Sequence, residues 1–96
     1  MRPYEILFII KTDREEEEFD AVIEKFTALI EREGDQVSKV DKWGKRKLAY
    51  EIDKKYRDGF YTLINFEGEP GVASELDRVM RISEEILRHM ITKLEQ

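Results

Sequence analysis

Residues 4–10 read Tyr-Glu-Ile-Leu-Phe-Ile-Ile and form an almost continuously apolar run. β-branched and aromatic side chains are typical of strands, and a run without regular alternation indicates a strand buried on both faces. Pro3 comes just before the run, at a place where a missing N–H costs a sheet little. We therefore expect residues 4–10 to form a central strand, around which the rest of the fold is built.

The segment that follows, from Thr12 to Gly34, is predicted to be a helix. A capping box, either Thr12 with Glu15 or Asp13 with Glu16, would bind amide N–H groups at its start. Glycine is a typical helix stop, which places the end at Gly34. One face of the helix is apolar, because hydrophobic residues recur at spacings of three and four. These residues are Phe19, Val22, Ile23, Phe26, Leu29 and Ile30.

Two strands joined as a hairpin are expected next. The first covers residues 37–52 and is interrupted near Trp43-Gly44. The second covers residues 60–66, where two sets of side chains alternate between the faces of a sheet. The polar residues 53–59 between them are predicted to form the hairpin loop.

A shorter helix and a final strand complete the pattern. Pro70 suits the first turn of the helix, residues 83–85 form a turn, and residues 86–94 form the strand. The order strand, helix, strand, strand, helix, strand is the ferredoxin-like, split βαβ arrangement of an α+β protein. It implies one domain over residues 1–96, with a four-stranded antiparallel sheet and both helices on one face. The apolar residues that mark the second helix are Val72, Leu76, Val79 and Met80.

Composition excludes several classes of protein. The 96 residues include no cysteine, so disulfides and thiol chemistry are ruled out. No apolar run approaches the roughly 20 residues that a membrane span needs. The net charge is −5, but it is unevenly distributed. Residues 12–36 hold ten acids and three bases, whereas residues 37–58 hold eight bases and four acids. The central segment is therefore basic within an acidic chain, and Glu15–Glu18 are expected to face solvent.

No constellation for catalysis, metal binding or a cofactor is evident. His89 is the only histidine, and there is no cysteine to join it as a metal ligand. A structural or surface role is the more ordinary interpretation of such a residue. The glycines of residues 68–71 lack the spacing of a phosphate loop. We expect neither an enzyme nor a small-molecule substrate.

The basic segment is the feature that points to a partner. Lys45, Arg46 and Lys47 follow Trp43 and Gly44 on the interrupted strand. Cations held on a strand can contact phosphates, which favours RNA, although a solvated run of charge is the ordinary alternative. Trp43 could stack on a base or pack against the protein, and the sequence leaves both open.

The uncovered face of the sheet is predicted to be apolar. Leu7, Ile9 and Leu63 would lie there, and an exposed apolar patch usually marks an interface. RNA-recognition modules of this topology stack bases on sheet aromatics. Here residues 59–63, Gly-Phe-Tyr-Thr-Leu, lack the basic start and the second small residue of that signature. The sequence therefore favours a protein partner on this face.

Two segments resemble one known family. The opening residues 1–6, Met-Arg-Pro-Tyr-Glu-Ile, are similar to the start of the bacterial small-subunit ribosomal protein S-six family. Residues 43–52, Trp-Gly-Lys-Arg-Lys-Leu-Ala-Tyr-Glu-Ile, resemble that family's signature of a glycine, basic residues and Leu-Ala-Tyr-x-Ile. The sequence departs from the pattern at Glu51, where many members have proline. This acid, with Asp53 beside it, weakens the local positive field.

The resemblance implies a function and a set of contacts. It implies a non-enzymatic component of the cytoplasmic ribosome that binds the central domain of small-subunit ribosomal RNA together with the ribosomal protein S-eighteen. The RNA contacts it implies at matching motif positions are Arg2, Arg46 and Lys47. Arg81 and Arg88 are implied by their place in the second helix and last strand. Lys45 joins the set through the basic segment itself.

Two rival functions remain. A regulatory or ligand-binding ferredoxin-like domain could dimerise through the same sheet. A small acylphosphatase-like enzyme would need a phosphate-binding loop after the first strand, and residues 11–16, Lys-Thr-Asp-Arg-Glu-Glu, are too acidic for one.

Overall fold

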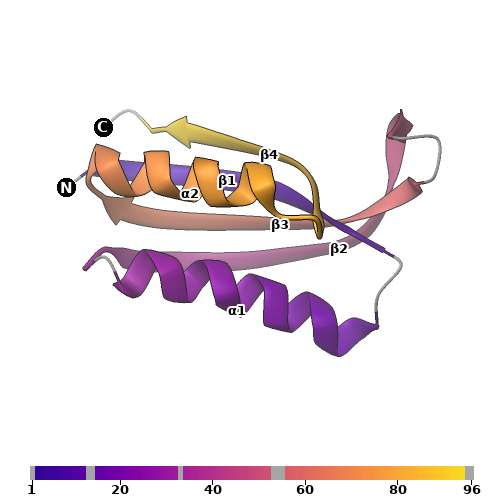
Figure 1. Cartoon of the computed structure of the whole chain (residues 1–96), viewed down its shortest axis with the longest axis horizontal. Helices are drawn as coiled ribbons and strands as arrows, with labels where there is room; N and C mark the ends of the chain where they lie inside the picture. Colours follow the sequence, from indigo (N-terminus) through magenta and orange to yellow (C-terminus); the bar gives the residue numbers. More distant parts are fainter. Residues whose placement is uncertain (1, 13–14, 33, 53–55, 95–96) are drawn as a thin grey trace.

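The computed structural model describes residues 2–12, 15–32, 34–52 and 56–94, with side chains described outside residues 49–57. The described residues form a four-stranded sheet with two helices packed against it (Figure 1). The chain order is the expected ferredoxin-like one. The elements are β1 (Arg2–Lys11), α1 (Glu16–Arg32), β2 (Gln36–Ile52), β3 (Tyr56–Gly68), α2 (Pro70–Ile82) and β4 (Ile86–Lys93).

The sheet has the strand order β2-β3-β1-β4, with every neighbouring pair antiparallel. β1 is an interior strand, as predicted. Its side chains alternate between buried and half-buried, however, so the expectation of burial on both faces is wrong. The reason is that α1 and α2 cover only one face, which leaves the odd-numbered residues of β1 partly open to water. We call the uncovered side the open face.

The core lies between the helices and the sheet. Phe19 of α1 stacks on Phe60 of β3, with ring centroids 4.3 Å apart, and Phe8 meets the edge of Phe26 at 5.7 Å. Such pairs add about 0.5–1.5 kcal/mol each to the gain from burying the rings. Thr62 is fully buried on the same side of β3. Aromatic packing thus fixes how α1 sits on the sheet.

The start of α1 differs from the prediction. The helix begins at Glu16, and the hydroxyl of Thr12 donates a long hydrogen bond of 3.4 Å to the carbonyl oxygen of Asp58. The Thr12 capping box is therefore wrong, because this side chain ties β1 to the β2–β3 hairpin instead. Asp13 of the alternative box lies outside the described residues. The helix end is confirmed, since Gly34 has a φ of 86° and donates its N–H to the carbonyl of Glu31.

The β2–β3 hairpin is longer than predicted. β3 begins at Tyr56, so residues 56–59 belong to the strand and not to a loop. In Figure 1 the hairpin extends past the ends of both helices. The predicted interruption of β2 is confirmed, since the register with β3 shifts between Lys42 and Gly44, where φ is 85°.

Candidate nucleic-acid interface

The three consecutive cations of β2 point to alternate sides of the hairpin. Lys45 pairs with Phe60, whose side chain faces the helices, whereas Arg46 pairs with Gly59 on the next position. Successive strand residues face opposite sides, so Lys45 and Lys47 lie on the helix side and Arg46 on the open face. All three are exposed. Within the part of the chain that the structure describes, no carboxylate forms an ion pair with any of them.

The cation just before them is already paired. Lys42 binds Asp20 of α1, with 2.5 Å between Nζ and Oδ1. Both side chains are about half exposed, so the pair stabilises the fold little. It nevertheless neutralises Lys42, and the positive charge available to a ligand is concentrated beyond the register shift.

A second feature is an aromatic–guanidinium cluster, made of Trp43, Arg46 and Tyr61. The Trp43 and Tyr61 rings are parallel to within 7°, with centroids 6.3 Å apart. The guanidinium carbon of Arg46 lies 5.3 Å from the Trp43 ring centroid. Trp43 is 38% exposed, and its indole N–H donates to Oδ2 of Asp41 at 3.1 Å. Trp43 is therefore partly open to solvent and not a core residue.

Gly59 allows side chains to close over the strand beside this cluster. A Cβ built on Gly59 would lie 2.2 Å from Cγ2 of Ile9 and 3.3 Å from Cδ2 of Leu48. Only glycine leaves room for both side chains. The packing of Ile9 and Leu48 beside the cluster thus depends on the absence of a side chain at Gly59.

The remaining predicted RNA contacts do not all join the basic segment. Arg88 pairs with Ile9, and Ile9 pairs with Tyr61, so Arg88 lies at the cluster end of the open face. Arg2 pairs with Gly68, which is nine residues from Gly59 along β3. At about 3.4 Å per residue, this places Arg2 roughly 30 Å from Arg46. The predicted set is therefore split between two ends of the sheet.

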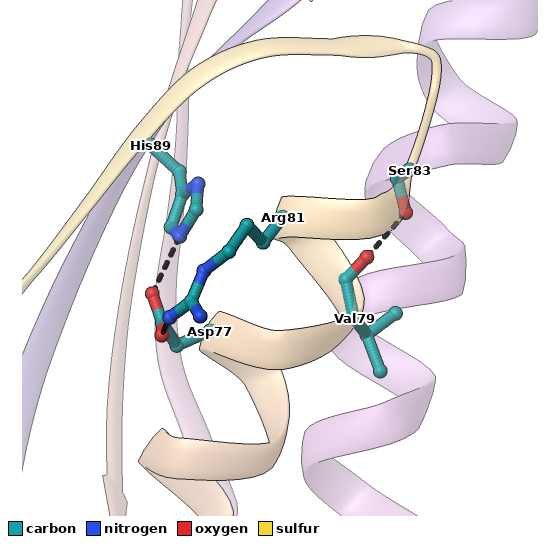
Figure 2. Close-up of polar contacts among 5 residues, drawn as sticks. All are labelled: Asp77, Val79, Arg81, Ser83 and His89. Atoms are coloured by element: carbon teal, nitrogen blue, oxygen red, sulfur yellow. Dashed lines mark hydrogen bonds and ion pairs between the residues drawn. The ribbon is translucent and has the colours of Figure 1, made fainter.

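Arg81 is held by its own helix. Figure 2 shows its guanidinium bound to the carboxylate of Asp77, one turn earlier in α2. The Nε2 of His89 donates to the other oxygen of that carboxylate at 2.7 Å. The hydrogen bond from His89 lowers the pKa of Asp77, and the charge of Arg81 lowers it further against the opposing loss of solvation.

Asp77 was not among the predicted functional residues, although its spacing of four from Arg81 is a recognisable sign of a helix pair. His89 is mostly buried and links β4 to α2 through Asp77. This supports the structural interpretation of the histidine. Near it, the hydroxyl of Ser83 donates to the carbonyl of Val79 at 2.7 Å and closes the end of α2 (Figure 2).

The predicted apolar patch is assembled on the open face. Leu7 pairs with Leu63 on one side and with Met90 on the other, and Ile9 lies two residues along β1. Met90 is 61% exposed. It was not predicted to belong to the patch, because one methionine in a short strand does not indicate which face of the sheet it lies on. The patch crosses three strands and is bordered at one end by the aromatic–guanidinium cluster.

Among residues 2–12, 15–32, 34–52 and 56–94, no group of three His, Asp or Glu side chains is arranged to hold a metal ion. None of the helices described is long and apolar enough to cross a membrane. A shallow groove between α1 and β2 is lined by Glu15, Glu16, Phe19, Gly44, Lys45 and Phe60.

Residues 3–93 match the model of the family described as Ribosomal protein S6. The chain belongs to this family. The small ribosomal subunit protein bS6 of Moorella thermoacetica is 52% identical over 96 residues, which cover 100% of this chain and 97% of that protein. The bS6 protein of Clostridium acetobutylicum is 49% identical over the full length of both chains. Family members are structural proteins of the small ribosomal subunit and not a class of enzymes.

The fold agrees with that of a solved member. The crystal structure of 30S ribosomal protein S6 from Thermotoga maritima superimposes with a TM-score of 0.90 at 36% sequence identity. The match covers 97% of this chain and 87% of that one. The ferredoxin-like arrangement predicted from the order of elements is therefore confirmed.

Proposed function

We propose that this member of the S-six family binds small-subunit ribosomal RNA through the β2 segment Lys45–Lys47 and does so together with the S-eighteen protein. The observation that carries the proposal is the exposure of three consecutive cations on both sides of a projecting hairpin. They have no ion-pair partner among the residues that the structure describes. In a chain of net charge −5, an unneutralised basic segment is a specific feature and not a general property of the surface.

The other three arginines predicted to contact RNA are expected to contribute unequally to binding. Arg88 lies at the same end of the open face as Tyr61, two strands away from it, and would add a contact at that end. Arg2 would contact a separate part of the RNA, because it lies at the far end of the sheet. Arg81 contributes less, since Asp77 already neutralises much of its charge. RNA binding would thus depend mainly on one end of the molecule, with an additional contact at the other.

The protein partner is assigned to the apolar patch Leu7, Leu63 and Met90, with Ile9 at its border. An apolar patch on an uncovered sheet is a typical interface. The negative net charge favours association with a basic protein, because opposite fields steer the encounter. A shared site would let the partner supply phosphate contacts that this chain lacks.

The double variant Arg46→Ala/Lys47→Ala tests the RNA contact. Each substitution removes one proposed phosphate contact, so affinity for a central-domain RNA fragment should fall. The slope of log affinity against log salt should become shallower by about two. The measurement is a filter-binding titration at several salt concentrations.

A matched control removes the same amount of positive charge from another part of the protein. Lys25→Ala/Arg32→Ala also removes two cations, but from α1 and outside the basic segment. It should leave the salt slope close to that of the wild type. Equal slopes for all three proteins would show that the basic segment makes no phosphate contact.

A further inference from the structure

The aromatic–guanidinium cluster differs in chemistry from the rest of the open face. It holds a half-exposed indole beside a parallel phenol ring on a sheet surface that no helix covers. The strand register places Arg46 and Arg88 at this end, while Glu5 and Glu67 lie on the same face at the opposite end. The aromatic rings and two arginines therefore gather at one end, with Asp41 beside Trp43, while Glu5 and Glu67 lie at the other end.

Two contacts orient Trp43 in the unbound protein. Its indole N–H is engaged by Asp41, and the parallel ring of Tyr61 supports it from the neighbouring strand. A ring that is already ordered loses little conformational entropy when it binds a ligand. Because the N–H is engaged, the ring offers a π surface and not a hydrogen-bond donor.

We propose that Trp43 and Tyr61 form a stacking site for an unpaired RNA base, and that Arg46 binds a phosphate next to that base. A guanidinium is planar and stacks on the same ring surface that a base would use. An exposed cation–π contact is weaker than base stacking on an aromatic side chain. The base would therefore displace Arg46 from Trp43, and the released guanidinium could hold a phosphate with two hydrogen bonds.

Two properties of the ligand follow from this geometry. The base must be unpaired, because a base within an A-form helix has no free face to offer. The site should tolerate all four bases, since each has a π face and the indole donor is already used. The inference rests on the proposed RNA binding but specifies a contact that phosphate neutralisation alone would not make.

Trp43 is the only tryptophan in the chain, so its fluorescence reports on this site alone. The probes are a single-stranded oligouridine and an abasic oligomer of the same length, titrated at low salt, where phosphate contacts are strong. Oligouridine should quench Trp43, and the abasic oligomer should not. Oligouridine should also bind more tightly than the abasic oligomer.

Variants separate stacking from charge. Trp43→Leu should lower the affinity for labelled oligouridine by about 5- to 150-fold, the range expected for loss of one stacked base. Trp43→Phe should keep most of the affinity, because a ring remains. Neither change should alter binding of the abasic oligomer. Thr92→Ala, at an exposed position of the same face but outside the cluster and the apolar patch, should leave both affinities unchanged.

The outcomes distinguish this inference from the proposed function. If both oligomers bind equally without quenching Trp43, the stacking site is wrong and the phosphate contacts stand. If neither oligomer binds, both the stacking site and the RNA-binding function are overturned. If Trp43 responds to the S-eighteen protein and not to oligouridine, the cluster belongs to the protein interface and the stacking site is rejected.

Discussion

Arg46 shows that a basic segment is easier to predict from sequence than the face of the sheet on which each of its side chains lies. The sequence marks residues 45–47 as basic, and the structure confirms that all three are exposed. Counting alternate residues from Lys42 would place Arg46 on the helix side. The register shift at Gly44 inserts one residue and reverses the faces, so Arg46 joins Trp43 on the open face. Periodicity predicts a strand but not the position at which its phase changes.

At the residue scale, Asp77 should make stability depend on pH. Its pKa is lowered in the folded protein, chiefly by the hydrogen bond from His89. A lowered pKa contributes stability above the unfolded-state value, and this contribution is lost as pH falls through the folded-state value. Asp77→Asn should therefore lower the melting temperature at pH 7. The difference from wild type should shrink below about pH 4, where carboxylates become protonated.

Thermal melts between pH 3 and pH 7 would measure this effect. Glu24→Gln, an exposed position on α1, is a control for the loss of one negative charge. A constant difference between Asp77→Asn and wild type across this range would mean that the ionised carboxylate does not stabilise the fold.

Two glycines offer a second test at the residue scale. Gly59→Ala should destabilise the protein by about 1–3 kcal/mol, because its Cβ would overlap the stiff β-branched side chain of Ile9. Gly71→Ala is the control, since a Cβ there meets nothing within 4 Å and alanine favours a helix. It should be neutral or stabilising by up to about 1 kcal/mol. Urea denaturation measures both, and equal stability of the two variants would contradict the steric argument.

At the scale of elements, the helices were predicted best where periodicity is strong. Every apolar position predicted for α1 is buried. Pro70 begins α2, as expected from its fixed φ. The boundaries were less predictable because they depend on tertiary partners. Thr12 has a capping sequence but binds Asp58, which is 46 residues away in the chain.

The acidic start of α1 should matter for stability more than for RNA binding. Glu17 and Glu18 are exposed, as predicted, and they favour the positive end of the helix dipole. Glu17→Gln/Glu18→Gln should cost roughly 0.3–1 kcal/mol per residue in unfolding free energy. RNA affinity should change less than about twofold, because carboxylates facing phosphates would only repel. A large loss of affinity would indicate that α1 contacts the RNA directly.

At the scale of the whole molecule, the open face should make RNA binding cooperative with the protein partner. We expect the S-eighteen protein to strengthen RNA binding by the wild type. Leu63→Asp should reduce that gain by about tenfold or more, because it places a charge at the centre of an apolar interface. RNA titrations with and without the partner would measure the effect, with circular dichroism to verify folding.

Thr92→Asp provides the matched control, because it adds the same charge at an exposed position of β4. It should retain most of the partner's effect. If the wild type alone binds RNA as tightly as the mixture does, the shared site is wrong. If Leu63→Asp instead halves the mass of the free protein, the face serves self-association, as in the rival dimerising domain.

The position of β1 has a consequence for how the protein is made. Among the described elements β1 is made first, whereas one of its two neighbours in the sheet, β4, is made last. Until β4 has emerged from the ribosome, the amides along one edge of β1 lack their sheet partners. The sheet can close only when β4 pairs with β1. A partly made chain therefore exposes one edge of its interior strand, and only a chain that includes β4 covers it.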